Sequence, residues 1–153
     1  MTIHRNEYGN RRKAPINTGG CGVVIAVPFD FTLTEDYVAS TDIIEFGVVP
    51  AGCKVIDVDG AGNGWGTGLT AAVGYMSGKV GADTNDDGSP RTCGNQFFPA
   101  LDIDPGNASM TVANKMTQTV DYDNDRSIGA IISANQTAGG ETLRLIVKYM
   151  AVR

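Results

Sequence analysis

The sequence lacks long apolar runs. Its longest ones reach about seven residues, whereas a helix that spans a bilayer needs roughly 20. The chain does not open on a basic stretch followed by an apolar one, so we expect no signal peptide and synthesis in a cytoplasm. Charged residues are also few, at 19%, while apolar residues make up 42%. This composition excludes a disordered tail and indicates one folded domain.

Cysteine is scarce and widely spaced. The three cysteines, Cys21, Cys53 and Cys93, form no C-x-x-C pair and offer too few ligands for a zinc site. We interpret them as reduced thiols in or near the core. A cross-link between subunits remains the alternative.

The residues of common catalytic sites are nearly absent. The one histidine, His4, lies in a polar stretch, where we expect it to be solvated rather than held for catalysis. There is no G-x-S-x-G or H-E-x-x-H motif. The glycines of residues 60–68 alternate and do not form G-x-G-x-x-G, so we predict no dinucleotide or other cofactor. The chain is therefore predicted not to be an enzyme.

Negative charge prevails, but it is unevenly distributed. Residues 1–20 hold four basic residues against Glu7, a net charge of +3, so the remainder of the −5 chain carries −8. The basic residues are Arg5, Arg11, Arg12 and Lys13. An acidic body argues against nucleic acid as a partner, whereas a basic segment suits docking onto a negatively charged surface.

Alternating apolar residues dominate the rest of the chain. Residues 1–20 show no periodicity and are predicted to form an extended arm before a single domain at 21–153. Strands are predicted at 22–31, 42–49, 53–60, 69–78, 96–103, 117–124, 127–134 and 142–153, with Ile56 and Val58 facing inward in the third. The segment 104–116 is ambiguous between strand and helical turns. The glycine-dense residues 60–68 and residues 81–95 are interpreted as loops, the latter long and exposed.

About eight strands and no long helix indicate an all-β protein, a β-sandwich that is jelly-roll-like, with an extended N-terminal arm. An immunoglobulin-like sandwich remains an alternative. The last strand carries Ile146, Met150 and Val152 on its second face. That face is too apolar for water alone, so we expect it to meet a neighbour.

Two kinds of loop residue are candidates for binding. Trp65 either folds back onto the protein or anchors a partner. Acidic clusters lie at 83–87 and 121–125, where solvated turn carboxylates are favoured over a cation site. The second cluster has Arg126 where a calcium loop needs glycine.

Several segments resemble a known family. They are Pro28–Thr32 (PFDFT), Asp42–Val58 (DIIEFGVVPAGCKVIDV), Leu69–Met76 (LTAAVGYM) and Leu143–Ala151 (LRLIVKYMA). Together they resemble the capsid decoration (cement) proteins of tailed bacteriophages, small structural proteins of the phage head.

The resemblance implies a structural virion protein on the outer capsid surface, made in the host cytoplasm, often a homotrimer, that bridges subunits of the major capsid protein. Neither nucleic acid nor membrane is expected as a partner. Under this reading Arg5, Arg11, Arg12 and Lys13 pair with acidic groups on the shell, and Trp65 is a further contact. The alternatives are a tail, head-fibre or adaptor component, or a carbohydrate-binding or host-attachment module that uses Trp65.

Overall fold

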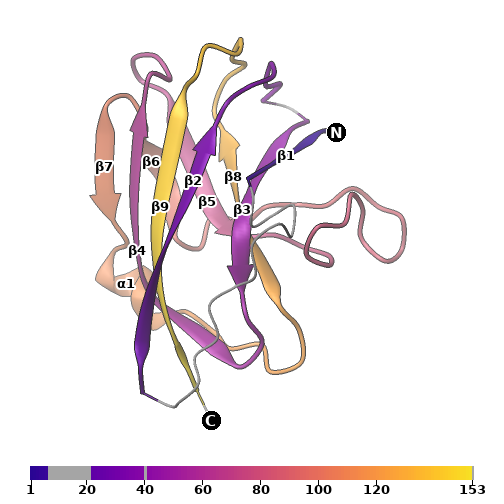
Figure 1. Ribbon diagram of the computed structural model, residues 1–153, viewed down its shortest axis with the longest axis vertical. Helices are drawn as coiled ribbons and strands as arrows, with labels where there is room; N and C mark the ends of the chain where they lie inside the picture. The colour runs from indigo at the N-terminus through magenta and orange to yellow at the C-terminus, as the bar shows by residue number, and fades with distance from the viewer. Residues whose placement is uncertain (7–21, 40, 153) are drawn as a thin grey trace.

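A computed structural model describes residues 1–6, 22–39 and 41–152. The elements in chain order are β1 (Ile3–Arg5), β2 (Val24–Thr32), β3 (Ile43–Val49), β4 (Cys53–Asn63), β5 (Thr70–Tyr75), β6 (Phe98–Asp102), β7 (Gly106–Ser109), α1 (Val112–Met116), β8 (Arg126–Ile132) and β9 (Thr142–Ala151). They form a β-sandwich of two packed sheets, as predicted (Figure 1). Among the described residues, no helix has the length and apolar character to span a membrane.

The strand order is that of a jelly roll. One sheet has the order β1-β3-β8-β5-β6 and the other β2-β9-β4-β7. Along the chain, the strands from β2 to β9 switch sheets at every step except β5 to β6. An immunoglobulin-like sandwich keeps its first two strands in one sheet, whereas β2 and β3 lie in different sheets. The order therefore favours the jelly-roll arrangement, with β1 added at one edge.

The strands β2 and β9 show why the alternating pattern predicts this fold. In β2 the side chains of Val27, Phe29 and Phe31 are buried, and the residues between them are exposed. The antiparallel pairing sets Val27 opposite Val147 and Phe29 opposite Leu145, so the apolar faces of both strands meet the same core. Figure 1 shows these two strands crossing the front of the sandwich.

The inward face of β4 differs from the prediction at one residue. Val55 and Val58 are buried, and Ile56 is only half-buried. The pairing with β9 shifts register between Val55 and Asp57, which marks a β-bulge. Because a bulge adds one residue to the strand, it moves the inward position from Ile56 to Val55.

The glycine-dense segment was predicted to be a loop, but its first residues belong to a strand, because β4 continues to Asn63. Gly60 and Gly62 pair with Leu145 and Leu143 of β9. A Cβ at Gly62 would lie 2.5 Å from the carbonyl oxygen of Ile103. The glycines therefore allow another segment to pack closely on the strand, which Cα substituents would prevent.

Two further segments differ from the expected strands. The ambiguous residues 104–116 contain both β7 and the short helix α1. The strand predicted at 117–124 is wrong: these residues form turns and bends that lead into β8. Asp121 accounts for part of this, because its carboxylate accepts the backbone N–H groups of Asp123 and Asn124 and so favours a tight turn.

Part of the predicted arm belongs to a sheet. Residues 3–5 form β1, which pairs in parallel with β3, Ile3 opposite Ile43 and Arg5 opposite Glu45. The extended-arm prediction is therefore wrong for these residues. Residues 7–20 of the predicted arm lie outside the described part of the chain.

Candidate interaction surface

Arg5 is used within the domain. Its Nε donates to Glu45 Oε2 at 2.7 Å, and its NH2 group donates to Asp83 Oδ1 at 3.0 Å and to the carbonyl oxygen of Ala82 at 2.7 Å. Burial lowers the pKa of Arg5, but the bonds to Glu45 and Asp83 outweigh this, so the net shift is upward. These bonds join β1 to β3 and to the 81–95 segment. The other predicted contacts of the arm, Arg11, Arg12 and Lys13, lie outside the described residues.

A buried carboxylate lies at the centre of this network. Glu45 has no exposed surface, and Arg91, only 2% exposed, donates to it from NH1 at 3.0 Å. Arg91 also donates from Nε to the carbonyl oxygen of Ser77 at 2.6 Å and from NH2 to Ser127 Oγ at 3.1 Å. The segment predicted as a long exposed loop is therefore fixed to the sheet at Arg91, while its tip projects from the sandwich (Figure 1).

Sequence reasoning missed this pair, although two signals were present. Glu45 is a charged residue inside the apolar run 43–49, and Arg91 is the one basic residue between Lys79 and Lys115. Charged side chains are almost never fully buried without a partner. A lone acid in an apolar strand therefore predicts a buried counter-charge elsewhere in the chain.

His4 is also held by packing, and the prediction that it is solvated is wrong. Its side chain is 8% exposed, and its Nε2 lies 3.4 Å from Asp42 Oδ2. The ring packs against Tyr37 and Phe31, with centroid distances of 5.7 and 6.4 Å. Asp42 also accepts the backbone N–H of Thr2 at 2.9 Å. His4 thus helps to fix β1 at the edge of the sheet.

Hydrogen bonds set the charge state of Asp42. Burial raises the pKa of this carboxyl, but the N–H groups of Val38 and Thr2, and then the side chains of His4 and Thr41, lower it by more. The net effect is a pKa below the ordinary value of aspartate. The carboxylate form is therefore the one that holds β1 in place.

Trp65 does not offer a surface contact. Its side chain has no exposed area, and its Nε1 donates to the carbonyl oxygen of Thr142 at 2.7 Å. The indole folds back onto the protein, which was one of the two predicted alternatives. Its assignment as a partner contact, for a capsid or for a glycan, is wrong for the structure described because a fully buried ring presents nothing to a partner.

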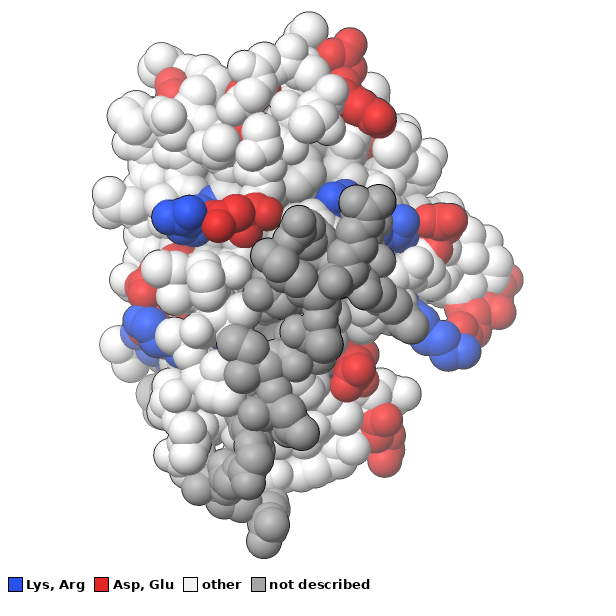
Figure 2. Space-filling view, viewed as in Figure 1, with Lys and Arg blue, Asp and Glu red and all other residues white. Residues whose placement is uncertain are grey.

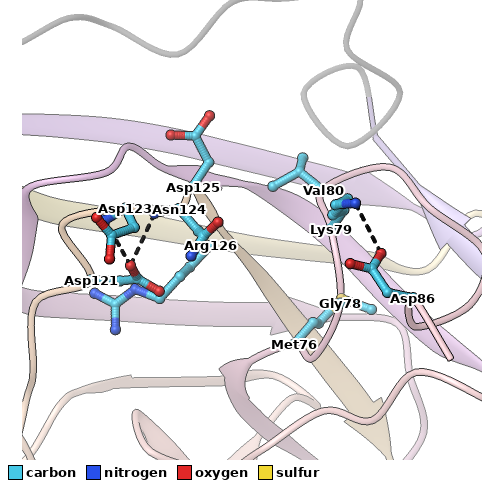
Figure 3. Close-up of a pocket in the computed structure, with 10 residues that line it drawn as sticks. All are labelled: Met76, Gly78, Lys79, Val80, Asp86, Asp121, Asp123, Asn124, Asp125 and Arg126. Carbon is cyan, nitrogen blue, oxygen red and sulfur yellow. Dashed lines mark hydrogen bonds and ion pairs between the residues drawn. The ribbon is translucent and has the colours of Figure 1, made fainter.

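Asp86 from the first acidic cluster and the aspartates of the second line one open hollow of about 610 Å³. Figure 3 shows Asp86 paired with Lys79 on one side and the turn from Asp121 to Arg126 on the other. The N–H groups of Asn124 and Asp123 hold the pKa of Asp121 below its usual value. Among the described residues, no three His, Cys, Asp or Glu side chains are placed to bind one metal ion. Asp87 accepts the N–H of Ser89, so like Asp121 it stabilises its own turn.

Two basic side chains on the outer face of the β2-β9-β4-β7 sheet are paired with carboxylates. Arg144 forms an ion pair with Asp30, and Lys148 contacts Asp57 at 3.0 Å and Asp59 at 2.7 Å. The bonds to Asp59 and Asp57 raise the pKa of Lys148. Figure 2, in the orientation of Figure 1, shows basic and acidic side chains in contact on the described part of this surface.

Apolar side chains on the same face remain half-exposed. Ile146 and Met150 of β9, and Val152 after it, all retain solvent-accessible area. A shallow hollow of about 280 Å³ lies beside Ile146 and Arg144. With Arg144 and Lys148 neutralised in pairs, this face is suited to contact with another protein, so the expectation of a neighbour there stays a prediction.

Cys53 is buried, and Cys93 is a partly buried free thiol. Burial raises the pKa of Cys93 to about 12, which disfavours the reactive thiolate. Cys21 lies outside the described residues.

Comparisons with known proteins point to phage capsids. No protein-family model matches the chain, and no curated protein sequence matches it. A chain in the capsid of Ralstonia phage GP4 is similar in structure, with a TM-score of 0.80 and 26% identity over 99% of both chains. A chain in the capsid asymmetric unit of cyanophage Pam1 has a TM-score of 0.58 and 14% identity over 92% of both chains, which shows a common fold alone. The likeness to the GP4 chain supports a structural protein of a phage virion.

Proposed function

We propose that this chain is a capsid decoration protein. It binds the outer surface of a phage head as a homotrimer and stabilises the shell by bridging subunits of the major capsid protein. The observation that carries the proposal is the likeness to a chain of the GP4 capsid, which covers 99% of both chains. Because the match covers 99% of that chain, a single domain of this size and fold forms a separate chain in the GP4 capsid.

The described structure suits a part that is folded before it binds. The core is closed between two sheets, and the fully buried carboxylate of Glu45 accepts hydrogen bonds from two arginines of its own chain. Such a domain loses little conformational entropy on docking, so contact area is converted more fully into affinity. Three linked copies would then gain avidity from weak individual contacts.

Three of the four basic residues of the N-terminal segment remain part of this proposal. Arg5 is engaged with Glu45 and Asp83, so it is not proposed as a shell contact. Arg11, Arg12 and Lys13 supply positive charge in sequence next to an otherwise acidic chain. In the proposal they contribute attraction to acidic groups on the shell, and this attraction is expected to weaken with salt.

The test is electron cryomicroscopy of heads assembled with and without the chain. We expect shells to form in both cases, with additional density outside the shell, over the joints between subunits, only when the chain is present. Shells that fail to assemble without the chain would make it the shell-forming protein instead. Density confined to the tail would favour a tail or adaptor component.

A further inference from the structure

The helix α1 presents its apolar side chains outward. Val112 is 71% exposed and Met116 is 78% exposed, and none of the five helix residues is buried. The two residues are four positions apart, so they lie on the same side of the helix. A surface helix of a globular protein normally turns such a pair toward the core. In α1 the arrangement is reversed.

Polar contacts hold the helix in this orientation. Lys115 Nζ lies 2.8 Å from Asp57 Oδ1 of β4, and Asn114 Nδ2 donates to the carbonyl oxygen of Phe97 at 3.1 Å. Thr111 Oγ1 caps the helix by accepting the N–H of Asn114. The side chain of Gln118, almost fully buried, donates to the carbonyl oxygen of Asn114 at 2.8 Å. Rotating the helix to bury Val112 and Met116 would break these contacts, so the outward apolar pair is built in.

Other exposed apolar residues lie at the same end of the sandwich. Val24, which is 50% exposed, pairs with Met150 near the end of β9, and Val23 precedes it. Tyr122, 61% exposed, follows Asp121, whose carbonyl oxygen accepts the N–H of Gly52 just before β4. Figure 1 shows α1, the start of β2 and the C-terminus toward one end of the molecule. We call this set, Val23, Val24, Val112, Met116 and Tyr122, the α1 end.

The α1 end contains five of the seven large apolar side chains that the described residues expose; the other two are Met1 and Val38. Tyr37, which precedes Val38, forms a β-bridge with Gln136. This bridge lies in the connections that follow β2 and β8, at the opposite end of β2 from Val24. The exposed apolar surface is thus concentrated at one end.

The charge beside this end is acidic. Asp123 and Asp125 are exposed next to Tyr122. Two nearby cations are engaged: Lys115 is paired with Asp57, and Arg126 lies 3.9 Å from the centre of the Tyr75 ring and donates to the carbonyl oxygen of Thr119. Lys54, opposite Met150, adds one positive charge beside the two exposed carboxylates of Asp123 and Asp125. A complementary surface is therefore apolar at its centre and bordered by Lys or Arg.

We infer that the α1 end is a protein-docking surface, with Val112 and Met116 as its anchors, for an apolar depression bordered by basic side chains on a capsid shell subunit. The inference rests on the proposed function, because that function makes the shell subunit the partner. Met is enriched at protein interfaces, and a few buried apolar anchors supply most of the affinity of such contacts.

The test compares binding of full-length variants to heads assembled without the chain. In V112S/M116S both anchors become small and polar at positions that bury nothing, and V38S makes the matched change at Val38, away from the α1 end. Circular dichroism and thermal unfolding establish that all three proteins fold alike. We expect V112S/M116S to bind at least 10-fold more weakly than wild type, and V38S to bind as wild type does. The charge reversal D123K should also weaken binding, less so at high salt.

The outcomes separate the two proposals. Wild type and V112S/M116S binding equally well would overturn the α1 end as the docking surface and leave the proposed function standing. Equal losses in V38S and V112S/M116S would also overturn it, since the effect would not be local. If wild type itself does not bind, the proposed function fails, and the inference that rests on it fails with it.

Discussion

The two outer faces of the sandwich use the same ion-pair chemistry in opposite ways. On the β1-β3-β8-β5-β6 sheet, which we call the covered face, the 81–95 segment folds back, and the Glu45–Arg91 pair has no exposed side-chain surface. On the β2-β9-β4-β7 sheet, the open face, the pair between Arg144 and Asp30 is more than half exposed on both sides. A described segment of the chain covers the first face, whereas on the second the Arg144–Asp30 pair stays in contact with solvent.

This difference shows that an ion pair must be judged by its surroundings. Water screens an exposed pair, so it contributes little to stability. In a buried pair each charge depends on the other, because removing one leaves the second desolvated and uncompensated. The covered face should therefore be sensitive to substitution, and the open face tolerant.

The largest effect is expected for Glu45→Ala. The change leaves the guanidinium of Arg91 buried without its carboxylate and removes the bond to Arg5 Nε. We expect the free energy of unfolding to fall by about 3–5 kcal/mol, the usual cost of breaking a buried pair. Urea unfolding measures this, with Asp30→Ala on the open face as the matched removal of a paired carboxylate. Equal effects of the two substitutions would refute the comparison.

A smaller loss is expected for Gly74→Ala, also on the covered face. The new Cβ would lie 2.5 Å from the backbone of Gly94, which crosses over β5 at this point. Overpacking against a backbone that cannot easily move costs about 1–3 kcal/mol. Ala26→Val adds methyl groups to an exposed position of β2, and there the unfolding midpoint should not change. An unchanged midpoint for Gly74→Ala would show that the covering segment is loosely held.

The loss of stability in acid should also differ between the two faces, but by less than the substitutions above. Because the pKa of Asp42 is lowered in the folded state, its stabilising effect is present above about pH 4, the ordinary aspartate value, and is lost as the pH falls below it. Asp42→Asn should remove about 1 kcal/mol at pH 7, the scale of one hydrogen bond, and flatten the loss of stability in acid. Asp59→Asn on the open face should change the profile less, since Asp59 is partly exposed. Unfolding midpoints between pH 2 and 7 test both.

The smallest effect is expected for Arg144→Ala. Its guanidinium and the carboxylate of Asp30 are both in contact with water. The unfolding midpoint should match that of wild type at low and high salt. A loss of stability comparable to that of Gly74→Ala would mean that the open face is held together by its ion pairs.

The sequence predicts the parts of the fold that depend on local alternation. The strands β2 and β9 appear close to their predicted bounds because Val27, Phe29, Leu145 and Val147 repeat at period two, and this period places them on one buried face. The sandwich class follows from the number of such strands. The choice of jelly roll over an immunoglobulin-like order comes only from the pairing of strands far apart in the chain.

The features that the sequence misses depend on non-local contacts. The sequence predicts an exposed loop at Arg91 because its partner, Glu45, is 46 positions away. The sequence leaves Trp65 undecided between the core and a partner, because the carbonyl group that its indole bonds to belongs to the distant residue Thr142. His4 is predicted to be solvated because the residues that bury it, Asp42 and Tyr37, are also distant in the sequence. In each case the immediate neighbours are polar or glycine-rich, and the packing that decides exposure comes from another segment.

The most direct measurement is the heat stability of filled heads with and without the chain. One sample of heads that lack the chain is warmed in the presence of a DNA-binding dye. A second sample of the same heads is mixed with the purified chain and then warmed in the same way. A protein that bridges shell subunits should raise the temperature at which DNA escapes, in a saturable way. The same release temperature with and without bound chain would contradict a stabilising role.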